Sequence, residues 1–312
     1  MNNSNYEYQT IPLQPDKEGE VVATLISHKR SKEFSQAVLL IHGYVDYFFQ
    51  DHVAEYIINQ GFGFYALDLR KYGRSLLPHQ TPNMVWKISE YFEEIGIAVK
   101  QIKQDHEFLV LMGHSTGGLT APLFVAEAPE GNLVDALALN SPFFQMNYPK
   151  ILRKTAIPFL AWIGRKLPKI NIALKLSKLY GKSLHKTYMG DWDYNLDWKP
   201  IEGYDIPAGW VNAIFQAQKR LRKGLYLNIP TLVIHSERSV NHIFKWNDDM
   251  HYADAVLDVS SMRKFAPRIS KKLKRVEIDG AKHDVFLSKD PIRRKALAVL
   301  GAWLKSLKNE AA

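Results

Sequence analysis

Short apolar runs recur along the chain and alternate with longer stretches of helical periodicity. Short runs of this kind are typical of buried strands, and strands that alternate with helices are typical of a parallel sheet covered on both faces. The pattern therefore predicts an α/β fold with a mostly parallel central sheet flanked by helices. The predicted strands are residues 38–41, 63–67, 108–112, 136–139, 231–234 and 276–278, with residues 21–26 as an antiparallel edge strand.

The alternation is interrupted in the middle of the chain by a basic, helix-like stretch that contains tryptophans. This stretch predicts a helical cap at residues 141–228, inserted into a core formed by residues 1–140 and 229–312. Within the cap, residues 208–222 follow Pro207 and carry apolar side chains at helical spacing, which predicts an amphipathic helix. Those apolar residues include Trp210, Ile214 and Leu221.

Charge distinguishes the predicted cap from the rest of the chain. The net charge is +9, yet no acidic residue lies between Asp135 and Asp191, so the ten basic residues there account for the whole surplus and leave −1 elsewhere. Interleaved apolar residues make this segment a basic amphipathic patch, which fits either a solvated helical face or a lid that meets anionic lipid. No recognised nucleic-acid-binding motif accompanies it, so we expect no nucleic acid partner. The ten residues are Lys150, Arg153, Lys154, Arg165, Lys166, Lys169, Lys175, Lys178, Lys182 and Lys186.

The chain contains no cysteine, which excludes disulfides, thiolate zinc sites and a cysteine nucleophile. Its polar N-terminus has neither the charged start nor the apolar run of a signal peptide. The longest nearly uncharged apolar stretch, residues 155–164, is shorter than the roughly 20 residues that a membrane span requires. We therefore expect a cytoplasmic protein without a transmembrane anchor, while its oligomeric state stays open.

The most specific motif is Gly113-His114-Ser115-Thr116-Gly117, which matches G-x-S-x-G. It follows a predicted strand and precedes a helix predicted at residues 119–128. In this context the flanking glycines allow a sharp backbone turn that leaves the serine hydroxyl exposed above the sheet. Ser115 is therefore the candidate nucleophile, and a structural turn serine is the alternative.

A serine hydroxyl is a poor nucleophile at neutral pH, so it needs a neutral imidazole to take its proton and a carboxylate to orient that imidazole. His283 lies just after the last predicted strand and before a final helix, where a fold with this serine motif places its base. We interpret most other histidines as exposed loop or surface residues. Examples are His28, His79, His106 and His185.

The carboxylate should closely follow the strand that ends near His235, but an insertion displaces it. Asp248 and Asp249 lie nearer to the strand, while Asp254 and Asp258 close the inserted loop. Of these we favour Asp254. The loop also contains residues that could suggest a metal site, but their spacing matches no ligand pattern, so we expect neither a metal nor a cofactor. Those residues are His235, His242, Asp248, Asp249 and His251.

Ester or amide hydrolysis needs backbone N–H groups directed at the developing oxyanion. One comes from Thr116, directly after the candidate nucleophile. The other comes from the loop after the strand at residues 38–41, where Tyr44 follows His42-Gly43. We therefore expect the N–H groups of Tyr44 and Thr116 to form the oxyanion hole.

Several motifs together resemble those of monoacylglycerol lipases and lysophospholipases, a group of α/β hydrolases also labelled serine aminopeptidase-like. The resemblance covers almost the whole chain and rests on His42-Gly43, Asp68-Leu69-Arg70-Lys71-Tyr72-Gly73-Arg74-Ser75, the serine motif, residues 253–258 and residues 280–283. It implies the α/β-hydrolase fold and a serine hydrolase that cleaves carboxylic esters through an acyl-enzyme. It also implies Asp254 as the acid, with Asp258 in a supporting role.

The chain departs from this group at two places. Lys71 stands where a small residue is usual, and residues 236–252 separate the acid from its strand. A serine aminopeptidase-like peptidase and a non-catalytic ligand-binding protein are the alternative functions. A peptidase pocket for a cationic amino terminus needs carboxylates, and the first part of the cap has none. We therefore expect a small acyl ester as substrate. Contact between the basic cap and an anionic lipid surface stays open beside the solvated face.

Overall fold

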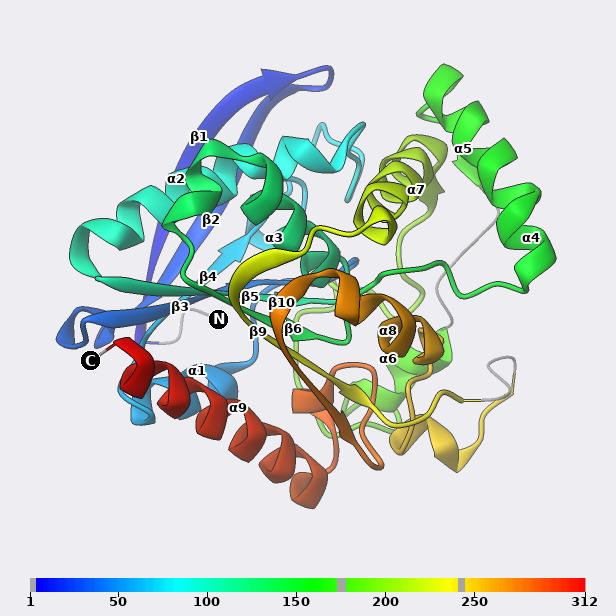
Figure 1. Ribbon diagram of the computed structural model, residues 1–312. Coiled ribbons are helices and arrows are strands. Elements are labelled where there is room, and N and C mark those ends of the chain that lie inside the picture. Colours follow the sequence, from blue (N-terminus) through cyan, green and yellow to red (C-terminus); the bar gives the residue numbers. More distant parts are fainter. Residues whose placement is uncertain (1–3, 173–177, 241–244, 312) are drawn as a thin grey trace.

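The computed structural model describes residues 4–172, 178–240 and 245–311. Its centre is a twisted eight-stranded sheet, in which six neighbouring strands, β4, β3, β5, β6, β9 and β10, are parallel (Figure 1). The predicted α/β fold is thus confirmed, and each predicted strand lies within an observed one. From one edge to the other the strands are β1 (Tyr6–Asp16), β2 (Gly19–His28), β4 (Gly63–Asp68), β3 (Gln36–Ile41), β5 (Phe108–His114), β6 (Ala136–Asn140), β9 (Leu227–Ser236) and β10 (Ser270–Ile278).

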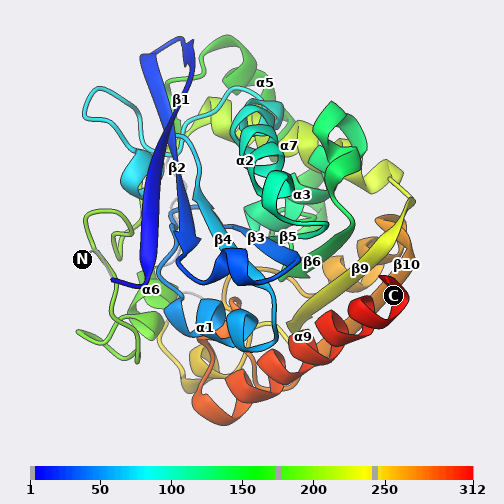
Figure 2. The same ribbon diagram turned by 90° about the vertical axis from the view of Figure 1, so that its left-hand side faces the viewer.

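Helices cover both faces of the sheet, which explains why its strands are almost continuously apolar. Side chains alternate along β3, so that Leu39 and Ile41 join one apolar cluster while Val38 and Leu40 join the other. Helices α2 and α3 pack on the first face, and α1 and α9 pack on the second (Figure 2). The helices outside the predicted cap are α1 (Asp51–Asn59), α2 (Tyr91–Asp105), α3 (Thr116–Glu127), α8 (Ser260–Phe265) and α9 (Asp290–Ala311).

The N-terminal edge of the sheet differs from the prediction. Strand β2 contains residues 21–26 and pairs antiparallel with β4, but β1 pairs on its outer side, so β1 and not β2 is the edge strand. The sequence of β1 lacks an apolar run because few of its side chains are buried. Ile11 and Leu13 pack into the cluster of Leu39, and Tyr6 packs into the cluster of Val38 on the other face, with mostly exposed residues between them.

Strands β6 and β9 are neighbours in the sheet, and the segment between them was predicted as the cap. It is called the cap segment (residues 141–228) below. The predicted amphipathic helix is present as α7, which buries Trp210, Ile214 and Leu221. The elements of the cap segment are α4 (Lys150–Lys154), α5 (Ala156–Lys166), α6 (Lys178–Leu184), α7 (Ala208–Lys223) and a small antiparallel sheet of β7 (Asn171–Ile172) and β8 (Ile206–Pro207).

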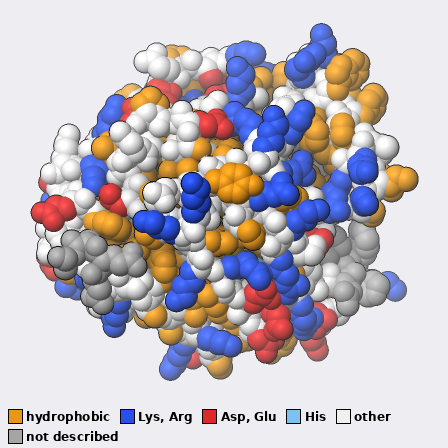
Figure 3. Space-filling model, viewed as in Figure 1, with side chains coloured by type: hydrophobic (Ala, Val, Ile, Leu, Met, Phe, Trp, Pro, Cys, Tyr) orange, Lys and Arg blue, Asp and Glu red, His pale blue; other side chains and the backbone are white. Residues whose placement is uncertain are grey.

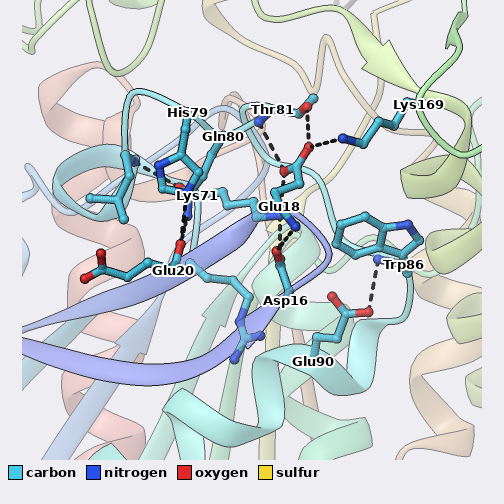
Figure 4. Close-up of polar contacts among 12 residues, drawn as sticks. Asp16, Glu18, Glu20, Lys71, His79, Gln80, Thr81, Trp86, Glu90 and Lys169 are labelled. Carbon is cyan, nitrogen blue, oxygen red and sulfur yellow. Dashed lines mark hydrogen bonds and ion pairs between the residues drawn. The ribbon is translucent and has the colours of Figure 1, made fainter.

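A buried group of charges joins the β1–β2 hairpin to the loop after β4 and to the cap segment (Figure 4). The ammonium group of Lys71 lies 2.6 Å from Asp16 and 2.7 Å from Glu18. Glu18 also accepts a hydrogen bond from Thr81 and lies 3.3 Å from Lys169 of the cap segment. Although burial opposes it, hydrogen bonds from Lys71 and Thr81 lower the pKa of Glu18 to about 2.

Lys71 itself has a φ of 64°, in the left-handed region that glycine, which has no Cβ atom, adopts at lower cost. This explains why a small residue is usual at this position in the group that the motifs resemble. Here the ion pairs with the hairpin hold Lys71 in place. Among the described residues, every helix is too short or too polar to cross a bilayer.

Candidate active site

Ser115 lies at a sharp turn between β5 and α3. Its φ of 52° and ψ of −110° fall outside the regions that non-glycine residues favour, so the backbone is strained there. A Cβ atom on Gly117 would collide with the carbonyl oxygens of Ile41 and His42. Only glycine therefore lets the turn pass this close to the end of β3.

His283, in the loop after β10, links Ser115 to Asp254. Its Nε2 lies 3.0 Å from the Ser115 Oγ, and its Nδ1 lies 2.9 Å from the Asp254 Oδ2. A carboxylate can only accept, so Nδ1 donates and Nε2 is left to accept from the serine hydroxyl. The three residues are 8%, 2% and 1% exposed for Ser115, His283 and Asp254 respectively, so the whole chain of hydrogen bonds is shielded from bulk water.

The carboxylate of Asp254 is fixed on both sides. While Oδ2 faces His283, Oδ1 accepts 2.8 Å hydrogen bonds from the backbone N–H groups of Val256 and Leu257. The backbone of Asp254 also pairs with the residues that follow β9, through bonds to Arg238 and Val240. These bonds place the acid beside residues 238–240, close to the end of β9, although the insertion separates it from that strand in sequence.

The other candidate acids lie elsewhere. Asp258 accepts a 2.9 Å hydrogen bond from the backbone N–H of Ser260, at the start of α8. Asp249 pairs with Arg238, and Asp248 is exposed. Within the described residues, no group of three or more His, Asp or Glu side chains is arranged to hold a metal ion, and His242 lies outside those residues.

The predicted oxyanion donors lie beside the sharp turn at Ser115, which is called the elbow below. Gly43, Tyr44 and Thr116 line the same cavity as Ser115. Thr116 is the first residue of α3, so its N–H has no acceptor within the helix. A Cβ atom on Gly43 would lie 3.2 Å from the Ser115 Cβ, so the loop after β3 packs closely on the elbow.

Two residues quoted above only as parts of motifs hold this loop. The His42 Nε2 accepts a 3.0 Å hydrogen bond from the Leu69 N–H, so its Nδ1 donates to the Gly43 carbonyl at 2.8 Å. Asp68, fully buried, accepts from the Phe48 N–H at 2.9 Å and from Arg74. The motif around residues 68–75 thus supports residues 42–48, the chain that follows β3.

A largely apolar cavity of about 210 Å³ opens next to Ser115 and His283. Both the core and the cap segment contribute to it, and its polar members from the cap segment include Tyr180 and Lys199. The apolar side chains that line it include Phe143, Met146, Leu184, Ile206, Trp210 and Leu257.

Helix α6 of the cap segment contacts the loop that carries the candidate base. The ring of Tyr180 packs edge-on against His283, with 5.8 Å between centroids. Lys282 is fully buried, and its Nζ donates to the Ser183 carbonyl at 2.5 Å. Burial lowers the pKa of Lys282 to about 8. No local motif signals the contact of Tyr180 and Ser183 with this loop, because only the tertiary structure brings them together.

Three histidines predicted to be exposed are buried instead. His28, His106 and His185 are each at most 4% exposed, whereas His79 is exposed. His106 shows the reason, because its two ring nitrogens lie within hydrogen-bonding distance of the Tyr65 hydroxyl and the Phe34 carbonyl. A polar side chain with internal partners can be buried at little cost.

The mostly parallel sheet, the serine at the turn after β5 and the segment inserted between β6 and β9 define an α/β hydrolase. A family model described as "Serine aminopeptidase, S33" matches residues 32–290, so the chain belongs to this hydrolase family. The resemblance predicted from the motifs is therefore confirmed at the level of the family.

Solved structures with the same fold include lipases and esterases. A soluble variant of monoglyceride lipase from Saccharomyces cerevisiae, in complex with a substrate analog, is 17% identical and superposes with a TM-score of 0.74, covering 97% of this chain and 96% of that one. The monoacylglycerol lipase of Paleococcus ferrophilus is 19% identical and superposes with a TM-score of 0.60, covering 88% of this chain and 96% of that one. Est1E of Butyrivibrio proteoclasticus is 17% identical and superposes with a TM-score of 0.57, covering 97% of this chain and 99% of that one. At these identities the likeness shows the fold.

Proposed function

We propose that this protein is a serine hydrolase that cleaves carboxylic esters, with Ser115 as nucleophile, His283 as general base and Asp254 as its orienting acid. The observation that carries this proposal is the continuous hydrogen-bonded series of these three side chains at the wall of an apolar cavity. In this proposal residues 141–228 form a cap over a core made of residues 1–140 and 229–312.

The acylation step follows from the positions of the protons. The Ser115 Oγ attacks the ester carbonyl carbon while the His283 Nε2 takes the hydroxyl proton. The carbonyl oxygen becomes an oxyanion, which the N–H groups of Tyr44 and Thr116 stabilise. When this intermediate collapses, the bond to the alcohol oxygen breaks, and His283 gives its proton to that oxygen. The acyl group stays on Ser115.

Deacylation repeats the sequence with water as the nucleophile. His283 takes a proton from water, and the resulting hydroxide attacks the acyl carbon. The bond to Ser115 then breaks, and His283 returns the proton to the serine oxygen. One ester and one water thus become one carboxylic acid and one alcohol, and the enzyme is regenerated.

The lining of the cavity supports an acyl ester with an apolar chain, such as a monoacylglycerol or a lysophospholipid. A peptidase that binds a cationic amino terminus needs an available carboxylate. Among the described residues that line the cavity, Asp46 is the single carboxylate, and its ion pair with Lys199 already neutralises it. A ligand-binding protein without activity would have no use for a strained serine connected to a histidine and an aspartate.

The surface of the cap segment supports a further part of this proposal, contact with an anionic lipid surface. Ile151, Phe159 and Trp162 are exposed on α4 and α5, and the Phe159 and Trp162 rings stack on each other. Hydrophobic side chains lie among Lys and Arg side chains over these helices (Figure 3). Apolar residues that enter the interface while cations meet headgroups are typical of peripheral lipid binding.

The test is a substrate panel with an active-site probe. We expect hydrolysis of p-nitrophenyl esters, a monoacylglycerol or a lysophospholipid, and covalent labelling by a fluorophosphonate. Aminoacyl p-nitroanilides serve as the peptidase control. Cleavage of the anilides in preference to all esters would overturn the proposed substrate class, and a parent protein that neither turns over nor is labelled would overturn the mechanism.

A further inference from the structure

A buried ion pair connects the cap segment to the oxyanion loop, defined here as residues 43–46. The Nζ of Lys199 lies 2.5 Å from the Asp46 Oδ1, and the two side chains are 12% and 3% exposed. The other oxygen of Asp46 accepts a hydrogen bond of 3.4 Å from the Gly43 N–H. One carboxylate therefore spans the loop from its last residue to its first, and a cation of the cap segment holds that carboxylate.

The backbone of this loop needs such support. Val45 has a φ of 49°, in the left-handed region that a β-branched residue rarely adopts. Strained conformations of this kind persist only where surrounding contacts hold them. The N–H of Tyr44, the proposed oxyanion donor, lies between the strained residue and Gly43, so its direction depends on the shape of the loop.

Charge gives Lys199 a second effect on the same loop. Burial alone would raise the pKa of Asp46, but Lys199 together with His114 and His42 holds that pKa below its usual value. Asp46 is therefore an anion in the wall of the cavity where the oxyanion forms. Without Lys199, this anion would oppose the new negative charge and compete for the nearby N–H groups.

Lys199 is itself held by its neighbours. Its ammonium lies 5.0 Å from the ring centroid of Phe49 and 5.5 Å from that of Tyr194. The backbone N–H of Asn195 donates to the Tyr47 hydroxyl at 2.7 Å, and Trp198 packs edge-on against the Tyr47 ring. Residues 194–199 of the cap segment therefore pack directly on residues 47–49, which follow the oxyanion loop in the chain.

We propose that Lys199 is a positioning residue, through which the seated cap segment holds the oxyanion loop in its active shape. The inference rests on the proposed ester hydrolysis and deepens it. Substrate access and oxyanion stabilisation are then coupled, because the segment that covers the cavity also completes the site for the transition state.

The test separates transition-state stabilisation from folding and from substrate binding. In Lys199→Met we expect kcat for p-nitrophenyl butyrate to fall about 10- to 100-fold while KM stays within about threefold, because the loss concerns the transition state. The Ki of a trifluoromethyl ketone, which forms an oxyanion adduct with the serine, should rise in parallel. Lys199→Arg should restore both values to within about threefold of the parent, since it restores the charge.

Lys186→Met is the matched control, because Lys186 forms an exposed ion pair with Asp193 in the same cap segment. It should leave kcat and Ki unchanged. The double variant Asp46→Asn with Lys199→Met buries no unpaired charge, so it also covers the case in which Lys199→Met alone does not fold. We expect its kcat to stay below that of the parent, because the loop has lost its tether.

Parent values of kcat and Ki in Lys199→Met, or in the double variant if the single one does not fold, would overturn the inference. So would a change in KM alone. Either result leaves the parent activity intact and concerns Lys199 only, whereas a parent protein without esterase activity or fluorophosphonate labelling would overturn the proposed function.

Discussion

The central sheet and the first two helices of the cap segment use apolar residues in opposite ways. In β3, residues 37–41 are all at most 5% exposed. In contrast, α4 buries none of its residues, and Phe159 and Trp162 of α5 are 59% and 55% exposed. An apolar pattern in the sheet thus reports packing within the chain, whereas the same pattern in α4 and α5 leaves a face for something outside it.

The charged residues of the core and of these two helices also differ in their surroundings. Arg70, Lys71 and Arg74, which support the core around the site, each lie within 2.8 Å of a carboxylate. The cations of α4 and α5 belong to a stretch without acidic residues, between Asp135 and Asp191. Catalysis in the core and contact with lipid at the cap should therefore respond to different substitutions.

The largest expected effect is that of Ser115→Ala on the core. Removal of the nucleophile should lower kcat for a soluble ester by about 10⁴- to 10⁶-fold without loss of the fold. Ser141→Ala is a matched control, because the Ser141 hydroxyl is buried near the site without a hydrogen-bond partner. Steady-state kinetics and circular dichroism measure both. Substantial activity in Ser115→Ala would contradict the mechanism.

The next effect distinguishes the two acids. Asp254→Asn should lower kcat by about 10⁴-fold, because an amide facing Nδ1 favours the wrong tautomer of His283. Asp258→Asn should leave kcat close to the parent value, since the amide oxygen of asparagine can accept the same hydrogen bond from the Ser260 N–H. The comparison uses kcat of each purified variant under identical conditions. Equal losses in the two variants would be inconsistent with the assigned acid.

An effect on the cap should be seen only with lipid. Attraction to anionic lipid is worth about 1 kcal/mol for each basic residue, so four substitutions should weaken vesicle binding by about 4 kcal/mol, or roughly 10³-fold, while hydrolysis of a soluble ester is unchanged. The substitutions to Gln are at Arg153, Lys154, Arg165 and Lys166. Lys169 is left intact because it pairs with Glu18, and Lys175 lies outside the described residues.

Four exposed lysines of the core provide the matched control for the cap variant. They are Lys271, Lys272, Lys274 and Lys295. Their replacement by Gln removes the same net charge from another surface, so it should weaken binding to phosphatidylserine vesicles much less. Salt near 1 M, where the Debye length is about 3 Å, should reduce the difference. If both variants bind these vesicles equally, net charge rather than the cap surface accounts for the binding.

The smallest effect concerns the contact between α6 and the loop of the base. Burial lowers the pKa of Lys282 from 10.5 to about 8, so between these values the unfolded chain binds more protons than the folded one. Stability should therefore rise from pH 8 to 10.5, by up to about 3 kcal/mol, and the penalty is complete below pH 8. Urea unfolding at pH 7.5, 9 and 10.5 measures this.

Lys282→Met should lack that part of the rise, while Lys305→Met, at an exposed position on α9, should retain it. The relevant quantity is the difference in slope between each variant and the parent, because other groups titrate in the same range. An identical pH dependence for the parent and Lys282→Met would contradict the buried-cation interpretation.

The fold could be predicted from the sequence where burial leaves a local pattern. Strands such as β3 and β5 are almost continuously apolar because helices cover both of their faces, and α7 shows one apolar stripe. Strand β1 was not predicted, because polar residues alternate with its buried side chains. The short elements α4, α6, β7 and β8 were also not predicted one by one, since a few residues carry too little periodicity.

The residues of the candidate site could likewise be predicted only where a local motif marks them. Ser115 and His283 lie in local motifs, and the geometry brings Asp254 rather than Asp258 to His283. Lys199 and Asp46 could not be paired from the sequence, because their contact joins positions 153 residues apart and neither lies in a motif that requires the other. The buried histidines were misjudged for a similar reason, since their polar partners are distant in sequence.

The separation of Ser115 and His283 by 168 positions in the sequence has a consequence for synthesis of the protein. The ribosome releases β1 to β5, and with them the serine turn, before it has made β9 and β10. The acid and the base follow only after the cap segment has been made, on loops beside β9 and β10. A nascent chain therefore holds a nucleophile without a base, and the mechanism proposed here keeps it inert toward lipid until His283 emerges and β10 joins the sheet.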